Sequence, residues 1–146
     1  MAPTRRARTS VPGANGLKLS GGKLFVSNSF RGTIHSIPLS PDQKPAGAPS
    51  LFATPGQVDD FAIAGDGSIY LATHGDTIMR AQADGTLTTV LPTGGDGSTA
   101  VAFVPGDPAS LYVLTTGGLL EGAGRPARLL RIALPGGPAF CDQAVP

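Results

Sequence analysis

The groups best suited to chemistry in this 146-residue sequence are polar side chains that recur just ahead of short apolar segments. Asn15, Asp59 and Thr99 occupy such positions, in the contexts Asn-Gly-Leu, Asp-Asp-Phe-Ala and Thr-Ala-Val-Ala. Carboxylate and amide oxygens are ligands that a hard divalent cation prefers. A bound cation can polarise a carbonyl group and lower the pKa of a water nucleophile, which is the chemistry of hydrolysis.

Further polar side chains follow the next apolar segment of the first two repeats: Asn28, Ser29, Arg31, His74 and Asp76. A histidine in such a place could contact a substrate or carry a proton, since its pKa lies near neutrality. Arg31 could orient an anionic substrate. Each candidate also has an ordinary alternative, because Asn-Gly is a common turn pair, an Asp can cap a turn, and a loop histidine is often simply solvated.

Other chemistries find little support in the sequence. It contains no phosphate-binding Gly-x-x-x-x-Gly-Lys-Ser/Thr loop, no Gly-x-Ser-x-Gly elbow and no His-Glu-x-x-His motif. Cys141 is the single cysteine, which excludes an internal disulfide and a thiolate metal site and leaves it without a role. His35 alternates with Ile34 in a strand-like segment and is interpreted as a residue of a sheet face.

The net charge and the hydropathy of the sequence limit the kinds of partner that the protein is expected to bind. The formal net charge is +1 and there is no Trp, so neither nucleic acid nor an anionic membrane surface is an expected partner. No apolar run approaches the roughly 18 residues that a membrane span needs, and no secretory signal is recognisable. A cytoplasmic location is therefore the default expectation, with a small molecule as the expected partner.

The composition favours short strands joined by tight turns. The chain has 21 Gly and 14 Pro, and nine of its ten acidic residues are Asp, with Glu121 the exception. Gly, Pro and Asp are turn residues, whereas the scarce Glu and Lys are helix formers. This balance excludes a helical bundle and predicts an all-β fold.

Internal repeats identify the architecture. Three segments share an apolar, Gly, apolar-aromatic pattern, and their aromatic residues Phe25, Tyr70 and Tyr112 are spaced by 45 and 42 residues. Propeller blades repeat at about this period and contain four antiparallel strands. The predicted strands span residues 17–20, 23–28, 33–39, 50–54, 61–64, 68–73, 77–83, 87–91, 101–104, 110–115 and 127–134. A β-sandwich with accidental regularity is the alternative.

The repeats predict a single propeller-type domain of about three blades. A flexible basic leader is expected over residues 1–11, followed by blades over residues 12–57 and 58–97. Residues 98–146 would form the third blade and a tail, in which a fourth strand after Pro138 is doubtful. Propellers usually have four to eight blades, so three blades leave apolar faces open. We expect either a homodimer that completes a six-bladed ring or a fragment of a longer protein.

The order and spacing of these motifs resemble the SMP-30/gluconolactonase/LRE-like family of six-bladed propellers. The likeness covers about residues 12–135, which correspond to about the last half of a family member. The residues that carry it are Gly13-Ala-Asn-Gly-Leu17, Asp59-Asp-Phe-Ala62, Gly65-Asp-Gly-Ser-Ile-Tyr-Leu-Ala72, Thr99-Ala-Val-Ala-Phe103, Leu111-Tyr-Val113 and Leu129-Leu-Arg-Ile132.

The resemblance implies a lactone hydrolase with one divalent cation at the mouth of the channel, Ca²⁺ or Zn²⁺, with Mg²⁺ and Mn²⁺ as further options. It implies that Asn15 and Asp59 are metal ligands and that Asp59 is also the general base. Asp60 stands where the family has a small Gly, which leaves open which of the two Asp side chains faces the channel. The family's first-blade Glu has no counterpart, and Thr99 is a poor ligand at the equivalent position. Asn28, Arg31 and His74 are then the candidate substrate-binding residues.

Two other functions remain open at this stage. Many propellers are non-catalytic binding or scaffold modules and would use the same face without a metal. An inactive truncated piece of a lactonase-like protein is the third possibility.

Overall fold

A computed structural model describes residues 13–120 and 122–134, and in this part of the chain all regular structure is β-strand. The strands form three antiparallel sheets with the orders β1-β2-β3-β4, β5-β6-β7-β8 and β11-β10-β9. The strands are β1 (Ala14–Ser20), β2 (Lys23–Asn28), β3 (Thr33–Pro38), β4 (Ser50–Ala53), β5 (Phe61–Ile63), β6 (Ile69–Ala72), β7 (Thr77–Ala81), β8 (Leu87–Pro92), β9 (Ser98–Val104), β10 (Asp107–Thr115) and β11 (Leu129–Ala133).

Tight Asp-Gly turns set the register within the middle sheet. Between β5 and β6, the Asp66 carboxylate accepts hydrogen bonds from the Ser68 backbone N–H at 2.9 Å and from its hydroxyl at 2.6 Å. Gly67 takes the left-handed conformation that such a turn requires, with φ of +81°. The turn pairs Ile63 with Ile69, so the apolar alternation of both strands falls on the same faces.

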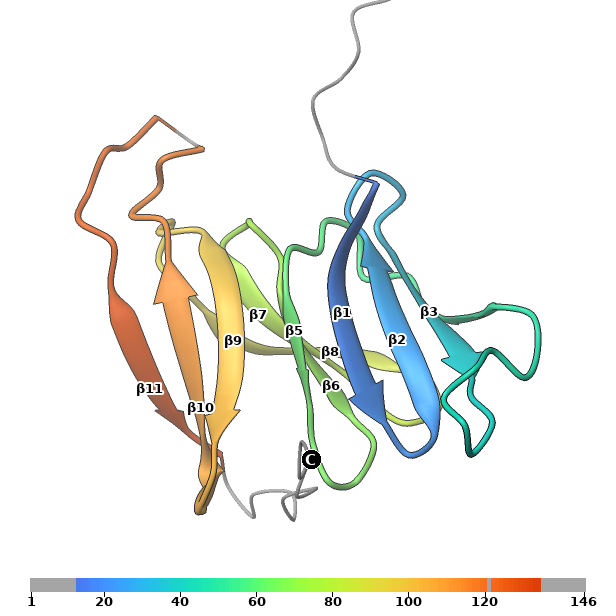
Figure 1. Ribbon diagram of the computed structural model, residues 1–146. Coiled ribbons are helices and arrows are strands. Elements are labelled where there is room, and N and C mark those ends of the chain that lie inside the picture. The colour runs from blue at the N-terminus through green and yellow to red at the C-terminus, as the bar shows by residue number, and fades with distance from the viewer. Residues whose placement is uncertain (1–12, 121, 135–146) are drawn as a thin grey trace, which may run out of the picture.

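The three sheets lie side by side, and the first strand of each is innermost. Figure 1 shows β1, β5 and β9 next to one another across the middle of the molecule, with the later strands of each sheet farther out. β5 contacts both β1 and β9. The ends of β1, β5 and β9 at which the chain enters these strands therefore gather at one end of the molecule.

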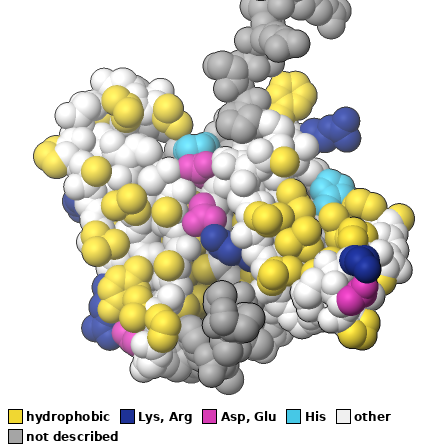
Figure 2. All heavy atoms as spheres, viewed as in Figure 1, with side chains coloured by type: hydrophobic (Ala, Val, Ile, Leu, Met, Phe, Trp, Pro, Cys, Tyr) yellow, Lys and Arg dark blue, Asp and Glu magenta, His cyan; other side chains and the backbone are white. Residues whose placement is uncertain are grey.

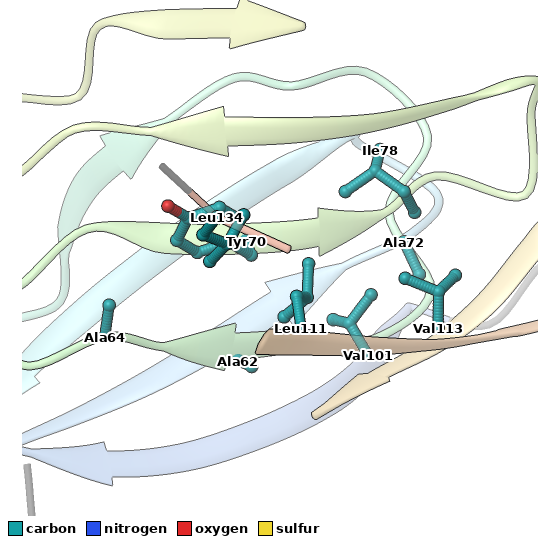
Figure 3. Packing of buried hydrophobic residues seen from close by; sticks show 9 residues of the cluster. All are labelled: Ala62, Ala64, Tyr70, Ala72, Ile78, Val101, Leu111, Val113 and Leu134. Atoms are coloured by element: carbon teal, nitrogen blue, oxygen red, sulfur yellow. The ribbon is translucent and has the colours of Figure 1, made fainter. Parts of the chain in front are cut away.

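The core lies between the sheets in two clusters. The cluster between the second and third sheets contains Ala72, Ile78, Leu111 and Val113, all fully buried, and Figure 3 shows their side chains pointing toward one another. Tyr70 packs edge-on against Phe103 of the third sheet, with ring centroids 5.5 Å apart. Side chains of small and large volume thus interdigitate, as close packing requires.

The second cluster joins the first sheet to the second. Phe25, Ile34 and Ala53 of the first sheet pack against Phe61 and Leu71 of the second. Because side chains alternate along a strand, the middle sheet uses Leu71 on this face and Ala72 on the other. The middle sheet is therefore buried on both faces, which explains its nearly unbroken apolar segment Ile69–Ala72.

The predicted all-β, propeller-like arrangement of consecutive sheets is present. Each predicted strand appears: β2 has the predicted bounds, and the other strands have shifted ends. β1, β9 and β10 begin at Ala14, Ser98 and Asp107, each three residues earlier than predicted. Register shifts separate these early residues from the regular pairing, and in β1 the shift leaves Asn15-Gly16 between the pairs Ala14–Asn28 and Leu17–Val26.

Some predicted features fall on residues that the structure does not describe. They are the basic leader at residues 1–11, Cys141 and the doubtful fourth strand after Pro138. In the described part of the third sheet three strands are present. Residues 13–120 and 122–134 include no helix that is long and apolar enough to cross a membrane.

Gly85 lies where the second sheet comes close to the first sheet, so a substitution there tests this contact. It has φ of +86°, and a Cβ there would lie 2.4 Å from the Phe52 carbonyl oxygen of the first sheet. Gly67 has nearly the same φ, but its added Cβ would meet only Ala83 Cβ at 3.7 Å. Gly85→Ala should therefore lower the free energy of unfolding by roughly 1–3 kcal/mol more than Gly67→Ala in urea titrations. Equal losses in the two variants would show that the backbone conformation, and not the sheet contact, sets the cost.

Candidate functional site

The Asp59 carboxylate is the centre of a polar cluster at the end of the molecule where the innermost strands begin. Its Oδ1 accepts a 2.7 Å hydrogen bond from Asn15 Nδ2, and its Oδ2 accepts a 2.6 Å bond from Thr99 Oγ1. His74 Nε2 lies 3.3 Å from the same Oδ2. These four residues come from all three sheets, so the cluster joins groups that lie up to 84 positions apart in the sequence, from 15 to 99.

The backbone around Asp59 is held by the ladder of the middle sheet. The Asp59 N–H donates to the Ala72 carbonyl at 2.8 Å, and the Ala72 N–H donates to the Asp60 carbonyl at 2.9 Å. Both bonds extend the β5–β6 pairing beyond the end of β5. The Asp59 side chain is 18% exposed, so it reaches solvent while its hydrogen-bond donors restrict its orientation.

Ser29 supports the Asn15 side chain. Asn15 Nδ2 donates to Ser29 Oγ at 3.0 Å, and the Ser29 hydroxyl donates to the Val58 carbonyl at 2.6 Å. Beside this contact, the Ser27 hydroxyl oxygen accepts a 2.7 Å hydrogen bond from the Gly16 N–H. The bulged start of β1 is thus fixed by two serines of the first sheet, which places the Asn15 amide against the carboxylate of the next sheet.

His74 has an unusual backbone conformation. Its φ is +59°, in the left-handed region that few non-glycine residues adopt. Its N–H donates to the Ser98 carbonyl at 2.9 Å, which ties this turn to the start of β9. Its Nδ1 atom is buried and has no hydrogen-bond partner among the residues described. A strained position of this kind, with the imidazole directed at Asp59, is often found at functional sites.

The two neighbouring acidic residues point to different partners. Asp60 Oδ1 forms an ion pair with Lys18 Nζ at 3.1 Å, and Lys18 lies over the Phe61 ring at 6.0 Å. Asp59 instead contacts the polar groups of all three sheets. The structure therefore directs Asp59, and not Asp60, into the cluster.

The remaining predicted residues lie at the same end of the sheets. Asn28 ends β2, and its Oδ1 accepts the Arg31 N–H at 3.0 Å, which closes the turn between β2 and β3. Arg31 is exposed on this turn. Asn15 and Thr99 are each the second residue of their strand, β1 and β9, and do not lie ahead of it, because these strands begin earlier than predicted. Figure 2 shows acidic and histidine side chains together at the upper middle of the molecule.

An ion-pair network between the buried Asp96 and two half-exposed arginines supports the segment that carries Thr99. The Asp96 carboxylate is buried and accepts hydrogen bonds from Arg125 Nε at 2.8 Å and from Arg128. Asp76 accepts a bond from Thr93 Oγ1 at 3.2 Å in the same loop. The Arg125 and Arg128 hydrogen bonds lower the pKa of Asp96 below its ordinary value of 3.8. Sequence reasoning missed this network, although an Asp in a glycine-rich loop and two later arginines were visible.

The cluster offers the kinds of oxygen ligand that a hard cation prefers, but it offers too few of them to complete a coordination sphere. Asp59, Asn15 and Thr99 bring a carboxylate, an amide and a hydroxyl together, whereas calcium usually takes six to eight oxygen ligands. Among the described residues there is no group of three or more His, Cys, Asp and Glu side chains that could hold a metal ion. Asp59, with Asn15 and Thr99, would therefore supply one part of a larger ligand set.

Comparison with known proteins identifies the fold family. The family model for the SMP-30/gluconolactonase/LRE-like region matches residues 2–117. The chain belongs to this family. No curated protein matches the sequence.

Solved structures of this family share the fold. A luciferin-regenerating enzyme superposes with a TM-score of 0.72 at 19% identity, over 88% of this chain and 47% of its own. The calcium-binding protein regucalcin from Agrobacterium tumefaciens gives 0.68 at 17% identity, over 88% and 50%. A gluconolactonase from Xanthomonas campestris gives 0.64 at 23% identity, over 85% and 38%. The chain thus spans about half the length of these proteins, and its three sheets match about half of a six-bladed propeller.

Acid titration tests the role of Asp96. Because its pKa is lowered in the folded state, its ionised form should stabilise the fold above the ordinary pKa of 3.8. That stabilisation should be lost as the pH falls through the lowered pKa. Asp96→Asn should therefore be less stable than the wild type at neutral pH and lose less stability on acidification to about pH 3, measured by urea denaturation. Asp84→Asn is the comparison: the hydrogen bond from the Thr86 N–H in its own turn also lowers the pKa of this exposed carboxylate, and the variant should reduce the pH dependence less than Asp96→Asn, which breaks the contacts with Arg125 and Arg128. A parallel pH dependence in wild type and Asp96→Asn would contradict this assignment.

Proposed function

We propose that this chain carries the Asp59 part of a hydrolytic site for a lactone or related cyclic ester, of the type found in its family. The observation that supports the proposal is the convergence of Asn15, His74 and Thr99 on the Asp59 carboxylate from three sheets. The gluconolactonase among the similar structures has a name that fits this chemistry, but its 23% identity supports the fold alone.

Asp59 is the proposed general base and cation ligand. Its carboxylate is partly exposed, so a water molecule can reach it and transfer a proton to it during attack on the ester carbonyl. Asn15 and Thr99 hold the carboxylate in one orientation through hydrogen bonds to different oxygens. A fixed base next to the substrate lowers the entropic cost of reaching the reactive geometry.

His74, Asn28 and Arg31 are the proposed substrate contacts. His74 is partly exposed beside Asp59, where its ring can donate a hydrogen bond to a substrate oxygen. Arg31 presents an exposed cation at the same end of the sheets, suited to a negatively charged group. Asn28 fixes the turn that carries Arg31. A divalent cation held by Asp59 and Asn15, Ca²⁺ or Zn²⁺ in the first instance, would polarise the ester carbonyl and lower the pKa of the attacking water.

A non-catalytic binding module is the second candidate. Both oxygens of Asp59 already accept hydrogen bonds from side chains of this chain, so the cluster is satisfied without a cation. In that case the same end of the propeller would bind a small polar molecule, and added cations would not change its affinity.

The pair Asp59 and Asp60 provides the test. Asp59→Ala should abolish stabilisation by Ca²⁺ or Zn²⁺ and lower lactone turnover by about 10²–10⁴-fold, the usual contribution of a general base. Asp60→Ala removes a neighbouring carboxylate whose partner is Lys18, and it should leave both properties near the wild-type level. Turnover is measured with gluconolactone by pH-stat titration, and cation binding by calorimetry and by the shift of the melting midpoint.

The outcomes separate the candidates. Loss of both properties in Asp59→Ala alone supports the hydrolytic site. Unchanged turnover in Asp59→Ala contradicts the assignment of the base. A wild-type protein that binds the lactone without hydrolysis, and whose affinity does not respond to a chelator, supports the binding module.

A further inference from the structure

The two end sheets each present an outer face with exposed apolar side chains. We define the first outer face as Leu17, Leu19, Leu24 and Val26, on the side of the β1–β4 sheet that points away from the middle sheet. Phe25 points into the core, so its neighbours Leu24 and Val26 must point outward, and the register places Leu19 and Leu17 beside them. Leu17 is 59% exposed.

The first outer face repeats positions that are covered in the other two sheets. Its pairs are Leu17 with Val26 and Leu19 with Leu24. The corresponding pairs are Phe61–Leu71 and Ile63–Ile69 in the second sheet, and Val101–Val113 and Phe103–Leu111 in the third. In both of those sheets this side packs against the sheet that precedes it in the sequence. The first outer face therefore has the residue pattern of a face that receives a preceding sheet.

We define the second outer face as Tyr112, Leu114 and Leu129 together with the ion pair of Asp107 and Arg131, on the side of the third sheet that points away from the middle sheet. Tyr112 pairs with Arg131, and Leu114 pairs with Leu129, which is 70% exposed. The Arg131–Asp107 distance is 3.0 Å. Figure 2 shows hydrophobic side chains over both end sheets, at the right and at the left of the view.

The second outer face repeats the side of the middle sheet that the third sheet covers. There Tyr70 pairs with Arg80, and Arg80 forms a 2.7 Å ion pair with Asp66 of the preceding turn. Tyr70, which is 4% exposed, packs edge-on against Phe103 of the next sheet. Tyr112, Arg131 and Asp107 reproduce this set, so the second outer face has the pattern of a face that a following sheet covers.

We propose that the second outer face of one copy of this chain packs against the first outer face of a second copy. The outer faces correspond residue by residue to the contact between the second and third sheets: Tyr112 occupies the position of Tyr70, and Leu19 occupies the position of Phe103. Tyr112 of one copy is therefore expected to contact Leu19 of the other. The contact joins two different faces, and such head-to-tail contacts form a closed ring or an open filament.

The six-bladed ring of the family's structures favours a closed dimer over an open filament. Three sheets match about half of a six-bladed ring, so a rotation by half a turn brings a second copy to the place of the other three sheets. Both contacts then form at once and all four outer faces are covered.

The dimer extends the proposed function by completing its site. The two-fold axis runs along the channel, which brings Asp59 and Asn15 of both copies to one mouth. The ligand set that one copy supplies only in part is thereby doubled. The interface itself is argued from the sheet faces alone, so its test requires no turnover and can fail or succeed independently of the hydrolytic site.

The solution mass of the 146-residue chain tests the proposal, measured by light scattering after size exclusion. The wild type should have a mass of 29.4 kDa, twice 14.7 kDa. Leu17→Asp and Leu129→Asp each place a charge on one outer face and should reduce the mass to that of the monomer. Thr89→Asp adds the same charge to an exposed residue of β8 in the middle sheet, and it should remain dimeric.

Far-UV circular dichroism and the melting profile show whether each variant is folded. Folded, monomeric Leu17→Asp and Leu129→Asp variants beside a dimeric Thr89→Asp support the interface. A monomeric wild type overturns the proposal and assigns the outer faces to other sheets of a longer protein. Masses that increase with concentration beyond the dimer also overturn it, because they show an open assembly. Folded outer-face variants that remain dimeric place the interface elsewhere.

Discussion

The packing of each sheet against its neighbour is the interaction on which the rest of this structure depends. No single sheet of three or four short strands can bury its apolar side chains alone. Phe61 and Leu71 on one side of the middle sheet and Ala72 and Ile78 on the other become buried only because a sheet lies on each face. The strand alternation that produces two apolar faces per sheet also propagates the arrangement from one sheet to the next.

The same packing creates the polar cluster. Asn15, Asp59 and Thr99 lie near the starts of β1, β5 and β9, and stacking the sheets brings these starts together at one end. Asp59 then accepts hydrogen bonds from the sheets on both sides of its own. The cluster is a product of the spacing between sheets, and the bulged start of β1 and the ion pairs of Asp96 adjust the position of its outer members.

Much of the fold follows from local patterns in the sequence. The alternation around Phe25, Tyr70 and Tyr112 and the Asp-Gly turns predict the strands, their order and the repeat. The extended starts of β1, β9 and β10 could not be predicted, because they depend on bulged pairing across the sheet. At the site, the repeat brings Asn15, Asp59 and Thr99 to one end of the sheets, and the family resemblance suggests their roles. The choice between Asp59 and Asp60 required the contact of Lys18, and the part of Thr99 as a donor required the distance between β5 and β9.

Repetition also explains why the end sheets resemble interior ones. Leu17 and Leu19 occupy positions that are buried in the next two sheets, and Tyr112 with Arg131 and Asp107 reproduces a set that is covered in the middle sheet. A terminal repeat that faces water usually has a polar outer surface, because an exposed apolar surface promotes association. Neither end sheet has such a cap in the described residues. These faces therefore carry the residue pattern of an interior position, as the proposed dimer requires. In the proposed dimer Asp59 and its neighbours would belong to a closed mouth, where the exclusion of water would strengthen the electrostatic interactions that the cluster makes.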